Sequence, residues 1–227
     1  PDYSLEEVST HAFALLLACN RGISQYDRAV KSGTWDWKAG RPLHRLSSGT
    51  LGLVGFGGIA RRLAAKLRTF GVDVIATDPY VDASMMRDYG VGKVSFDELL
   101  ERVEYLSIHV PLYDETRHMF SVDEFERLPE SAIVINTSRG PVIDEPALVA
   151  ALESSEIARA GLDVLESEPP APDNPLLERD DVVVTPHTAW YSRASRRDLP
   201  EGVARAVAAV LRGDPNHSIV DPETPWI

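Results

Sequence analysis

A glycine-rich turn between a short apolar run and a helical pattern constrains the fold more than any other feature of this sequence. Residues 51–54 are apolar and lead into Gly55-Phe-Gly57-Gly-Ile-Ala60, after which apolar residues recur at helical spacing. Strand, tight turn and helix in this order are typical of sites where a helix N-terminus holds a diphosphate. The alternative is an ordinary glycine turn, because a glycine pattern alone is weak.

An acidic residue lies at the position that a dinucleotide site requires. Asp78 follows Gly55 by 23 residues and directly follows the expected strand 72–77. Its carboxylate can accept hydrogen bonds from both hydroxyl groups of an adenosine ribose, and it repels a 2′-phosphate. Together with the turn, Asp78 therefore predicts a site for NAD rather than NADP.

Length and composition agree with a globular protein that has its own hydrophobic core. The chain has 227 residues and is 44% apolar, which is enough for one large domain or two modest ones. It contains no apolar run of the length that spans a bilayer, about 18 residues or more. Cys19 is the only cysteine, which excludes an internal disulfide and a thiolate zinc cluster. We expect a cytoplasmic protein.

The charge of the chain argues against two classes of partner. It has 35 acidic and 23 basic side chains, for a net charge of −12. Such an acidic protein should be repelled by nucleic acid phosphates and by anionic membranes. We therefore expect no nucleic acid partner and no membrane partner.

Short apolar runs alternate with helical patterns along the chain, which predicts an α/β fold with a doubly wound parallel sheet. The expected strands are residues 50–55, 72–77, 104–109, 132–137, 158–164 and 182–185. The expected helices are residues 5–20, 58–70, 96–102, 121–127, 144–154 and 192–212. In such a sheet the ligand lies beyond the carboxyl ends of the strands, so residues that follow a strand are candidates for function.

Three expected strand ends carry the residue types that reduction of a 2-keto acid requires. Arg139 follows the expected strand 132–137, two acids, Glu166 and Glu168, follow the strand 158–164, and His187 follows the strand 182–185. Arginine can bind the substrate carboxylate in a bidentate fork, and histidine can give a proton to the carbonyl oxygen as hydride arrives. A nearby carboxylate favours the protonated imidazole. The alternatives are a surface ion pair for Arg139 and a structural turn histidine for His187.

The remaining histidines share no metal-ligand spacing, so we expect no metal site. Each is expected to be structural or exposed. They are His11, His44, His109, His118 and His217.

Taken together, the motifs resemble the D-isomer-specific 2-hydroxyacid dehydrogenases over almost the whole chain. Besides the glycine turn they are Asp78-Pro-Tyr, His109-Val-Pro-Leu with Thr116, Asn136-Thr-Ser-Arg-Gly140, Gly161-Leu-Asp-Val with Glu168-Pro169, and Thr185-Pro-His187. The resemblance implies a Rossmann NAD-binding domain and hydride transfer between NADH and a 2-keto acid or D-2-hydroxy acid. It also implies that Arg139, Glu168 and His187 are the catalytic residues.

The resemblance further implies a set of cofactor-binding residues, with Asp163 near the nicotinamide carboxamide. Gly58 departs from the family, which commonly has a larger and often basic residue there, so one side-chain contact to phosphate is expected to be missing. The full set is Gly55, Gly57, Gly58, Ile59, Asp78, Val110, Pro111, Thr116, Thr137, Ser138, Asp163 and Ala189.

An indole at position 190 is less usual for this family. The spelling His187-Thr-Ala-Trp190 resembles the branch that contains the C-terminal binding proteins, which are NAD-dependent corepressors. Trp190 is expected to wall the substrate pocket, and packing at a helix start is the alternative. An NAD-sensing interaction module therefore stays open beside the dehydrogenase, and a partner whose affinity changes with NADH would distinguish them.

The resemblance also implies a division into domains. Residues 1–191 are expected to form the dinucleotide-binding domain with its leading helix, and residues 192–227 a remnant of an incomplete second, substrate-binding domain. We therefore expect a fragment that binds NAD with little or no turnover. The leading helix, with Trp35 and Trp37, is expected either to face a second subunit of a homodimer or to be buried within one chain.

Overall fold

The fold is built on one parallel sheet, and the computed structural model describes it for residues 2–40 and 42–214. Its strands are β1 (Thr50–Val54), β2 (Asp73–Thr77), β3 (Gly92–Lys93), β4 (Tyr105–Ile108), β5 (Ile133–Asn136), β6 (Arg159–Leu162) and β7 (Val182–Val184). All neighbouring pairs are parallel, in the order β3-β2-β1-β4-β5-β6-β7. Because the strand order reverses between β1 and β4, a ligand can bind in the crevice beyond the carboxyl ends of these two strands.

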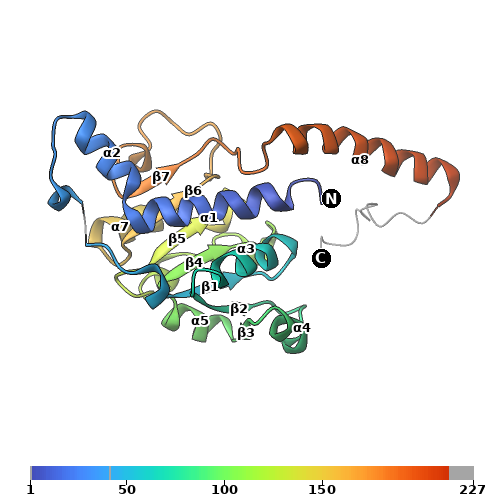
Figure 1. The fold of residues 1–227 in the computed structure, drawn as a ribbon, viewed down its shortest axis with the longest axis horizontal. Helices are drawn as coiled ribbons and strands as arrows, with labels where there is room; N and C mark the ends of the chain where they lie inside the picture. Colours follow the sequence, from blue (N-terminus) through green and yellow to red (C-terminus); the bar gives the residue numbers. More distant parts are fainter. Residues whose placement is uncertain (1, 41, 215–227) are drawn as a thin grey trace.

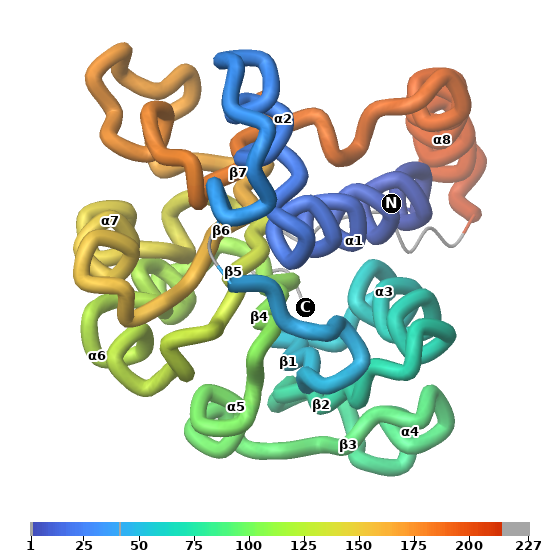
Figure 2. Tube along the Cα trace, turned by 60° about the vertical axis from the view of Figure 1, so that its left-hand side comes forward, coloured from blue at the N-terminus to red at the C-terminus, as the bar shows by residue number. Residues whose placement is uncertain are grey.

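Helices cover both faces of this sheet, so the expected doubly wound fold is confirmed (Figure 1). One face carries α1 (Leu5–Arg21), α3 (Gly58–Arg68) and α4 (Ala83–Asp88). The other carries α5 (Phe96–Arg102), α6 (Val122–Phe125) and α7 (Glu145–Ser154). Figure 2 shows α1 and α3 lying next to each other on their face of the sheet.

Each face has its own buried apolar cluster, because side chains of a strand alternate between the faces. In β1, Leu51 and Leu53 join the cluster under α1 and α3, and Val54 joins the cluster under α5. In β5, Ile133 and Ile135 face α1, and Val134 faces the other layer. These strands are therefore apolar on both sides, as expected for the centre of a covered parallel sheet.

The helices and strands expected from the sequence end within two residues of the observed ones. Three elements were not expected: α2 (Ile23–Lys31), α4 and the edge strand β3. The structure also has short 3-10 turns, η1 (Trp37–Ala39), η2 (Leu46–Ser48), η3 (Asp114–Thr116), η4 (Gly140–Val142) and η5 (Pro175–Leu177). α2 has no buried residue and β3 is only two residues long, so neither has the apolar pattern that identifies an element in a sequence.

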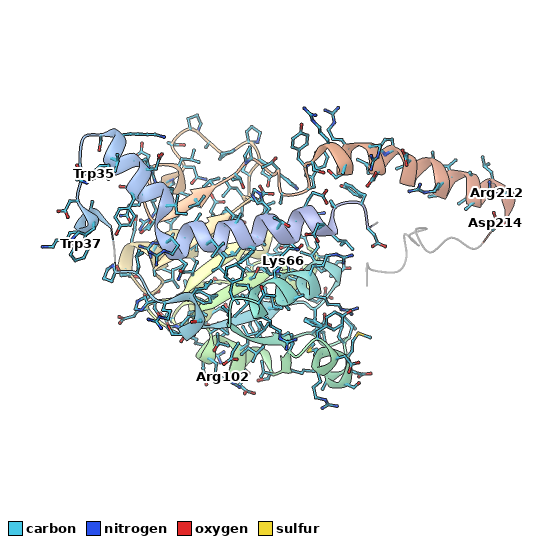
Figure 3. All side chains as sticks on the ribbon, in the orientation of Figure 1. Trp35, Trp37, Lys66, Arg102, Arg212 and Asp214 are labelled. Atoms are coloured by element: carbon cyan, nitrogen blue, oxygen red, sulfur yellow. The ribbon has the colours of Figure 1, made fainter. Side chains whose placement is uncertain are left out.

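The leading helix α1 is buried within the chain. Val8, Leu15 and Leu16 are buried, and α1 packs against α3, β5 and β6. This arrangement is the second of the two alternatives for the helix. By contrast, the side chains of Trp35 and Trp37 are 88% and 78% exposed and lie at the end of the molecule formed by α2 (Figure 3).

The last described helix, α8 (Arg193–Arg212), extends away from the sheet (Figure 1). Ser195, near its start, is its buried residue, whereas Val203, Val207 and Leu211 are exposed. Residues 215–227 of the expected second-domain remnant, together with His217, lie outside the described residues. In the part of the chain that the structure describes, no helix combines the length and apolarity needed to cross a bilayer.

Candidate active site

A cleft of about 390 Å³ lies at the carboxyl ends of the strands, where the strand order reverses. The structure brings many of the predicted site residues together here, although they come from five separate segments of the chain. The predicted residues that line the cleft are Ile59, Val110, Pro111, Thr137, Ser138, Arg139, Asp163, His187, Ala189 and Trp190. Tyr3, Ser4, Val8 and His109 also line it and were not predicted to do so.

The glycine turn after β1 forms one end of this region. Gly55 has a φ of +89°, and a Cβ there would lie 2.8 Å from the carbonyl oxygen of His109, so only glycine fits. Gly57 caps α3, and a Cβ there would meet nothing within 4 Å. The turn therefore presents an open face at the positive end of α3, where the first N–H groups have no partner within the helix.

Asp78 is held against this turn by backbone hydrogen bonds. Its Oδ2 accepts the N–H of Phe56 at 2.8 Å, and its Oδ1 accepts the N–H of Tyr80 at 2.8 Å. The side chain is half-buried. Each oxygen of a carboxylate can accept more than one hydrogen bond, so the group is fixed in orientation and can still accept from a ligand.

His187 and Glu168 form a direct pair in front of the sheet. The Nδ1 of His187 lies 2.7 Å from Oε2 of Glu168, and Glu168 Oε1 accepts the N–H of Leu165 at 3.1 Å. The pairing engages Nδ1, which makes Nε2 the ring nitrogen that can exchange a proton with a ligand. The side chains are 47% and 37% exposed, and His187 lines the cleft, whereas Glu168 does not.

Two residues after β5 contribute polar groups to the same cleft. Arg139 is exposed, its Nη1 donates to the carbonyl oxygen of Ser138 at 2.7 Å, and no ion pair involves it among residues 2–40 and 42–214. The hydroxyl of Thr137 is buried and has no hydrogen-bond partner within the described structure. A buried polar atom without a partner is costly, and a ligand in the cleft could satisfy this one.

Asp163 has a structural function that the sequence did not reveal. It is 1% exposed, and its carboxylate accepts the N–H groups of Thr188 and Ala189 at 2.9 and 2.8 Å. It also accepts the hydroxyl of Thr185 at 2.6 Å and pairs with His11 of α1 at 3.4 Å. The position of Asp163 directly after a buried strand was the available signal, but its partners lie far away in the sequence.

His109, the residue that follows β4, lines the cleft as a neutral imidazole. Burial lowers its pKa to about 4, and its Nε2 lies 2.9 Å from the hydroxyl of Ser107. Such a group can offer hydrogen bonds without placing a positive charge beside a bound ligand.

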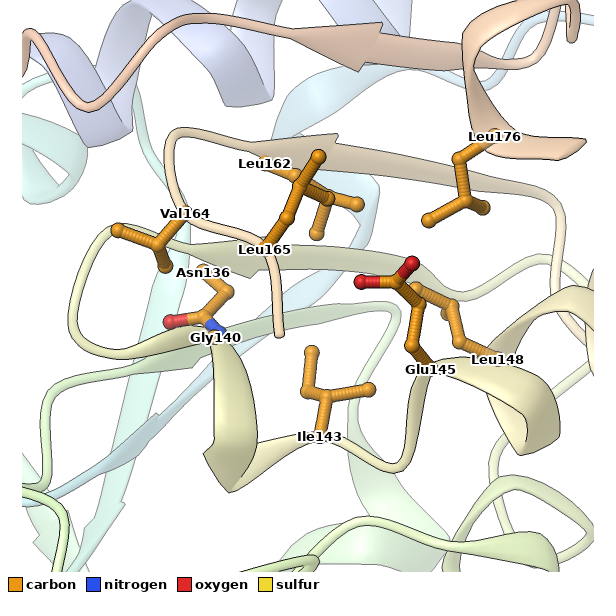
Figure 4. A pocket seen from close by; sticks show the side chains of 9 residues that line it. All are labelled: Asn136, Gly140, Ile143, Glu145, Leu148, Leu162, Val164, Leu165 and Leu176. Carbon is orange, nitrogen blue, oxygen red and sulfur yellow. The ribbon is translucent and has the colours of Figure 1, made fainter. Parts of the chain in front are cut away.

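The loops that follow β5 and β6 are packed directly on each other. A Cβ on Gly140 would lie 1.8 Å from the carbonyl oxygen of Leu165, so the close approach requires glycine. Figure 4 shows both residues around a cavity of about 10 Å³ that Glu145 also lines. Glu145 and Glu166 each accept the other's backbone N–H, at 3.0 and 3.3 Å. The loops that carry Arg139 and Glu168 are therefore fixed relative to each other.

Thr116 does not line the cleft. Its hydroxyl donates to the carbonyl oxygen of Pro111 at 2.7 Å and accepts the N–H of Tyr113 at 2.8 Å, which shapes the loop after β4. Within the described ranges, no group of three or more His, Cys, Asp or Glu side chains is arranged to hold a metal ion.

Comparison with known proteins gives consistent matches. Residues 13–189 match the family model of the D-isomer specific 2-hydroxyacid dehydrogenase, NAD binding domain. A glyoxylate reductase from Korarchaeum cryptofilum is 38% identical, and the match covers 98% of this chain and 68% of that protein. A D-3-phosphoglycerate dehydrogenase from Archaeoglobus fulgidus is 37% identical over 93% of this chain and 40% of its own length.

A solved structure agrees with these matches. D-lactate dehydrogenase with NAD+ from Lactobacillus jensenii superposes with a TM-score of 0.87 at 29% identity, covering 97% of this chain and 70% of that one. The chain thus spans between 40% and 70% of the length of these three proteins.

Proposed function

Because this chain belongs to the D-isomer-specific 2-hydroxyacid dehydrogenases and carries their NAD-binding domain, we propose that it serves hydride transfer between NADH and a 2-keto acid, or the reverse from a D-2-hydroxy acid. One observation carries the proposal. The paired His187 and Glu168, 2.7 Å apart, stand beside a cleft that Arg139 lines as well.

The residues present fit a dinucleotide. The open face at Gly57 and the N-terminus of α3 suit a diphosphate, and the fixed carboxylate of Asp78 suits an adenosine ribose. The partnerless hydroxyl of Thr137 suits a polar group of a ligand inside the cleft. When bound, the nicotinamide supplies or takes the hydride. The negative charge of Asp78 favours NAD over NADP, since it would lie against a 2′-phosphate.

The side chains of the cleft divide the remaining work. The Arg139 guanidinium binds the substrate carboxylate and orients the carbonyl group. His187 gives a proton from Nε2 to the carbonyl oxygen during reduction and takes it back during oxidation. Glu168 holds Nδ1 and stabilises the positive charge of the imidazolium. Substrates are therefore small acids with a keto or hydroxyl group next to the carboxylate.

The experiment is a panel of 2-keto acids with NADH, read as loss of NADH absorbance, on the product of the full reading frame. His187→Gln should lower kcat about 10²- to 10⁴-fold, the range of a lost general acid, and leave NADH binding in place. His44→Gln, at an exposed histidine away from the cleft, is the matched control and should keep full activity. Equal rates for the wild type and His187→Gln would reject the mechanism.

We propose that Trp190 forms one wall of the substrate pocket. It lines the cleft, its Nε1 donates to the carbonyl oxygen of His187 at 3.1 Å, and its ring lies edge-on to Tyr191. An aromatic wall favours apolar or extended keto acids. The dehydrogenases matched above give no support to the corepressor alternative.

We also propose that residues 1–191 form the cofactor domain and that residues 192–227 belong to a second domain. The exposed apolar residues of α8, a helix that extends away from the sheet (Figure 1), support this division. In this chain, the double variant Val203→Glu and Val207→Glu should change the unfolding free energy by no more than about 0.5 kcal/mol. In the product of the full reading frame the same variant should be clearly destabilising, and an equal effect in both would contradict the division.

We also propose that this chain alone binds NAD with little or no turnover. Steady reduction of a keto acid by this chain would contradict that proposal.

A homodimer is proposed on the exposure of two aromatic side chains. Trp35 and Trp37 are 88% and 78% exposed, and large aromatic residues are enriched in interfaces. Sedimentation should show a dimer that Trp35→Ser with Trp37→Ser converts to a monomer. A wild type that sediments as a monomer at all concentrations would contradict this.

The cytoplasmic location of the protein stays a prediction.

A further inference from the structure

The segment that carries His187 has no regular secondary structure, and its shape depends on one buried carboxylate. His187 has a left-handed backbone, with a φ of +51°, and its N–H donates to the carbonyl oxygen of Asp163 at 2.8 Å. The next two N–H groups, of Thr188 and Ala189, donate to the Asp163 carboxylate at 2.9 and 2.8 Å. The backbone position of His187 therefore depends on the position of Asp163.

His11 reaches this carboxylate from the far side, on the leading helix α1. Its Nε2 lies 2.9 Å from the hydroxyl oxygen of Thr185 and 3.4 Å from Oδ1 of Asp163. Thr185 has one hydroxyl proton, and Asp163 Oδ1, 2.6 Å away, can only accept it. The Thr185 oxygen must therefore accept from His11, which requires that Nε2 of His11 carries a proton.

A second contact from α1 lies one helical turn earlier. The hydroxyl of Ser192 donates to Oε1 of Glu7 at 2.7 Å, and Glu7 precedes His11 by four residues, so both lie on the same side of α1. Thr188, Ala189 and Tyr191 line an open groove of about 340 Å³ together with Glu7 and His11. The two contacts enclose residues 186–191, and α1 thus fixes both ends of the catalytic segment.

We propose that His11 is a positioning residue for His187: its Nε2–H orients Thr185 and Asp163, and Asp163 sets the backbone of residues 187–189. Glu7 supports the other end of the same segment. The proposal rests on the proposed function in giving His187 its catalytic role. His11 acts through Asp163 and touches no reacting atom.

The first test is the protonation of His11 in the wild-type chain. Long-range proton–nitrogen NMR of the imidazole should show a proton on Nε2 at neutral pH. A neutral ring protonated on Nδ1 alone would overturn the proposal. This measurement needs no variant, so it decides even if a substitution at His11 prevents folding.

The second test is amide hydrogen exchange of Thr188 and Ala189. His11→Leu should speed exchange of both about ten-fold, the effect of losing one hydrogen bond of roughly 1.4 kcal/mol. His11→Gln keeps a side-chain N–H and should restore slow exchange, whereas His44→Leu, the matched control, should change nothing. Unchanged exchange in His11→Leu would overturn the proposal.

Activity distinguishes failure of this proposal from failure of the proposed function. In the product of the full reading frame, His11→Leu should lower kcat about ten-fold with little change in KM for NADH. If His187→Gln has no effect on turnover, the proposed function fails while the exchange result stands. If His187→Gln abolishes turnover and His11→Leu leaves kcat unchanged, the positioning role fails alone.

Discussion

The carboxylate of Asp78 joins two tasks at the scale of a single residue. It accepts the N–H groups of Phe56 and Tyr80, so it shapes the turn, and it is the group proposed to hold the adenosine ribose. Replacement by alanine would remove both functions at once. Asparagine keeps one oxygen acceptor and removes the charge, so it separates ligand recognition from the fold of the turn.

Asp78→Asn should therefore weaken NAD binding about ten-fold, because charge-assisted hydrogen bonds to the ribose become neutral ones. It should also reduce the preference for NAD over NADP, since the repulsion of the 2′-phosphate disappears. Calorimetric titrations with both dinucleotides measure the two effects. Asp82→Asn, at an exposed carboxylate four residues later, is the control. Undiminished NAD affinity in Asp78→Asn would show that the carboxylate does not hold the ribose.

His109 makes a prediction about acid stability. Burial lowers its pKa in the folded protein to about 4, below the ordinary value of 6.5. As the pH falls below about 6.5, the unfolded chain takes up this proton first, so the folded state loses stability, by up to about 1.4 kcal/mol per pH unit. Above this range the contribution of His109 is fully present.

His109→Gln should remove this part of the acid sensitivity. Urea unfolding between about pH 7 and about pH 5 should give a flatter dependence of the unfolding free energy on pH than in the wild type. His44→Gln, at an exposed histidine, should keep the wild-type slope. The same slope in His109→Gln and in the wild type would show that His109 is not the buried neutral group.

At the scale of elements, the contact between two loops determines the geometry of the site. A Cβ on Gly140 would lie 1.8 Å from the Leu165 carbonyl oxygen, so Gly140→Ala must push the loops after β5 and β6 apart. We expect a loss of about 1 to 3 kcal/mol of unfolding free energy, typical of overpacking. Urea unfolding measures it.

A glycine in α8 provides the matched control. A Cβ on Gly202 would meet nothing within 4 Å, so Gly202→Ala should be neutral or stabilising by up to about 1 kcal/mol. If Gly140→Ala were equally harmless, the two loops would not be fixed by close contact.

The elements that could be predicted from sequence are those with strong apolar patterns. β1, β4 and β5 are mostly apolar and almost fully buried, and Gly55 to Ala60 predicted the turn that follows β1. α2 and β3 could not be found, because an exposed helix and a two-residue edge strand leave no such pattern. α4 is six residues long, too short for a helical period to be recognised.

At the scale of the whole molecule, the site is assembled from segments that are far apart in sequence. Arg139 and His187 could be proposed because each follows a strand, and parallel strands bring their carboxyl ends together. Two acids, Glu166 and Glu168, follow β6, and the family resemblance singled out Glu168. The network of His11, Thr185 and Asp163 could not, because the contact between His11 and Thr185 joins residues 174 positions apart. Only the packing of α1 across β5, β6 and β7 brings those partners into contact.

A second cavity lies at the amino ends of the strands, on the opposite side of the sheet from the cleft. Because the cofactor could bind in only one of the two places, its location can be tested. The second cavity has a volume of about 650 Å³, and residues at the amino ends of the strands line it, among them Gly49, Tyr105 and Arg159. The proposed function requires that NAD binds at the carboxyl ends of the strands and not in this cavity.

Backbone hydrogen exchange of the chain with and without NAD tests that claim most directly. We predict that NAD slows exchange in the glycine turn from Gly55 to Ile59 and in residues 137–139, and leaves the residues around Gly49 and Tyr105 unchanged. Protection confined to the residues at the amino ends of the strands, or no protection at saturating NAD, would contradict the account.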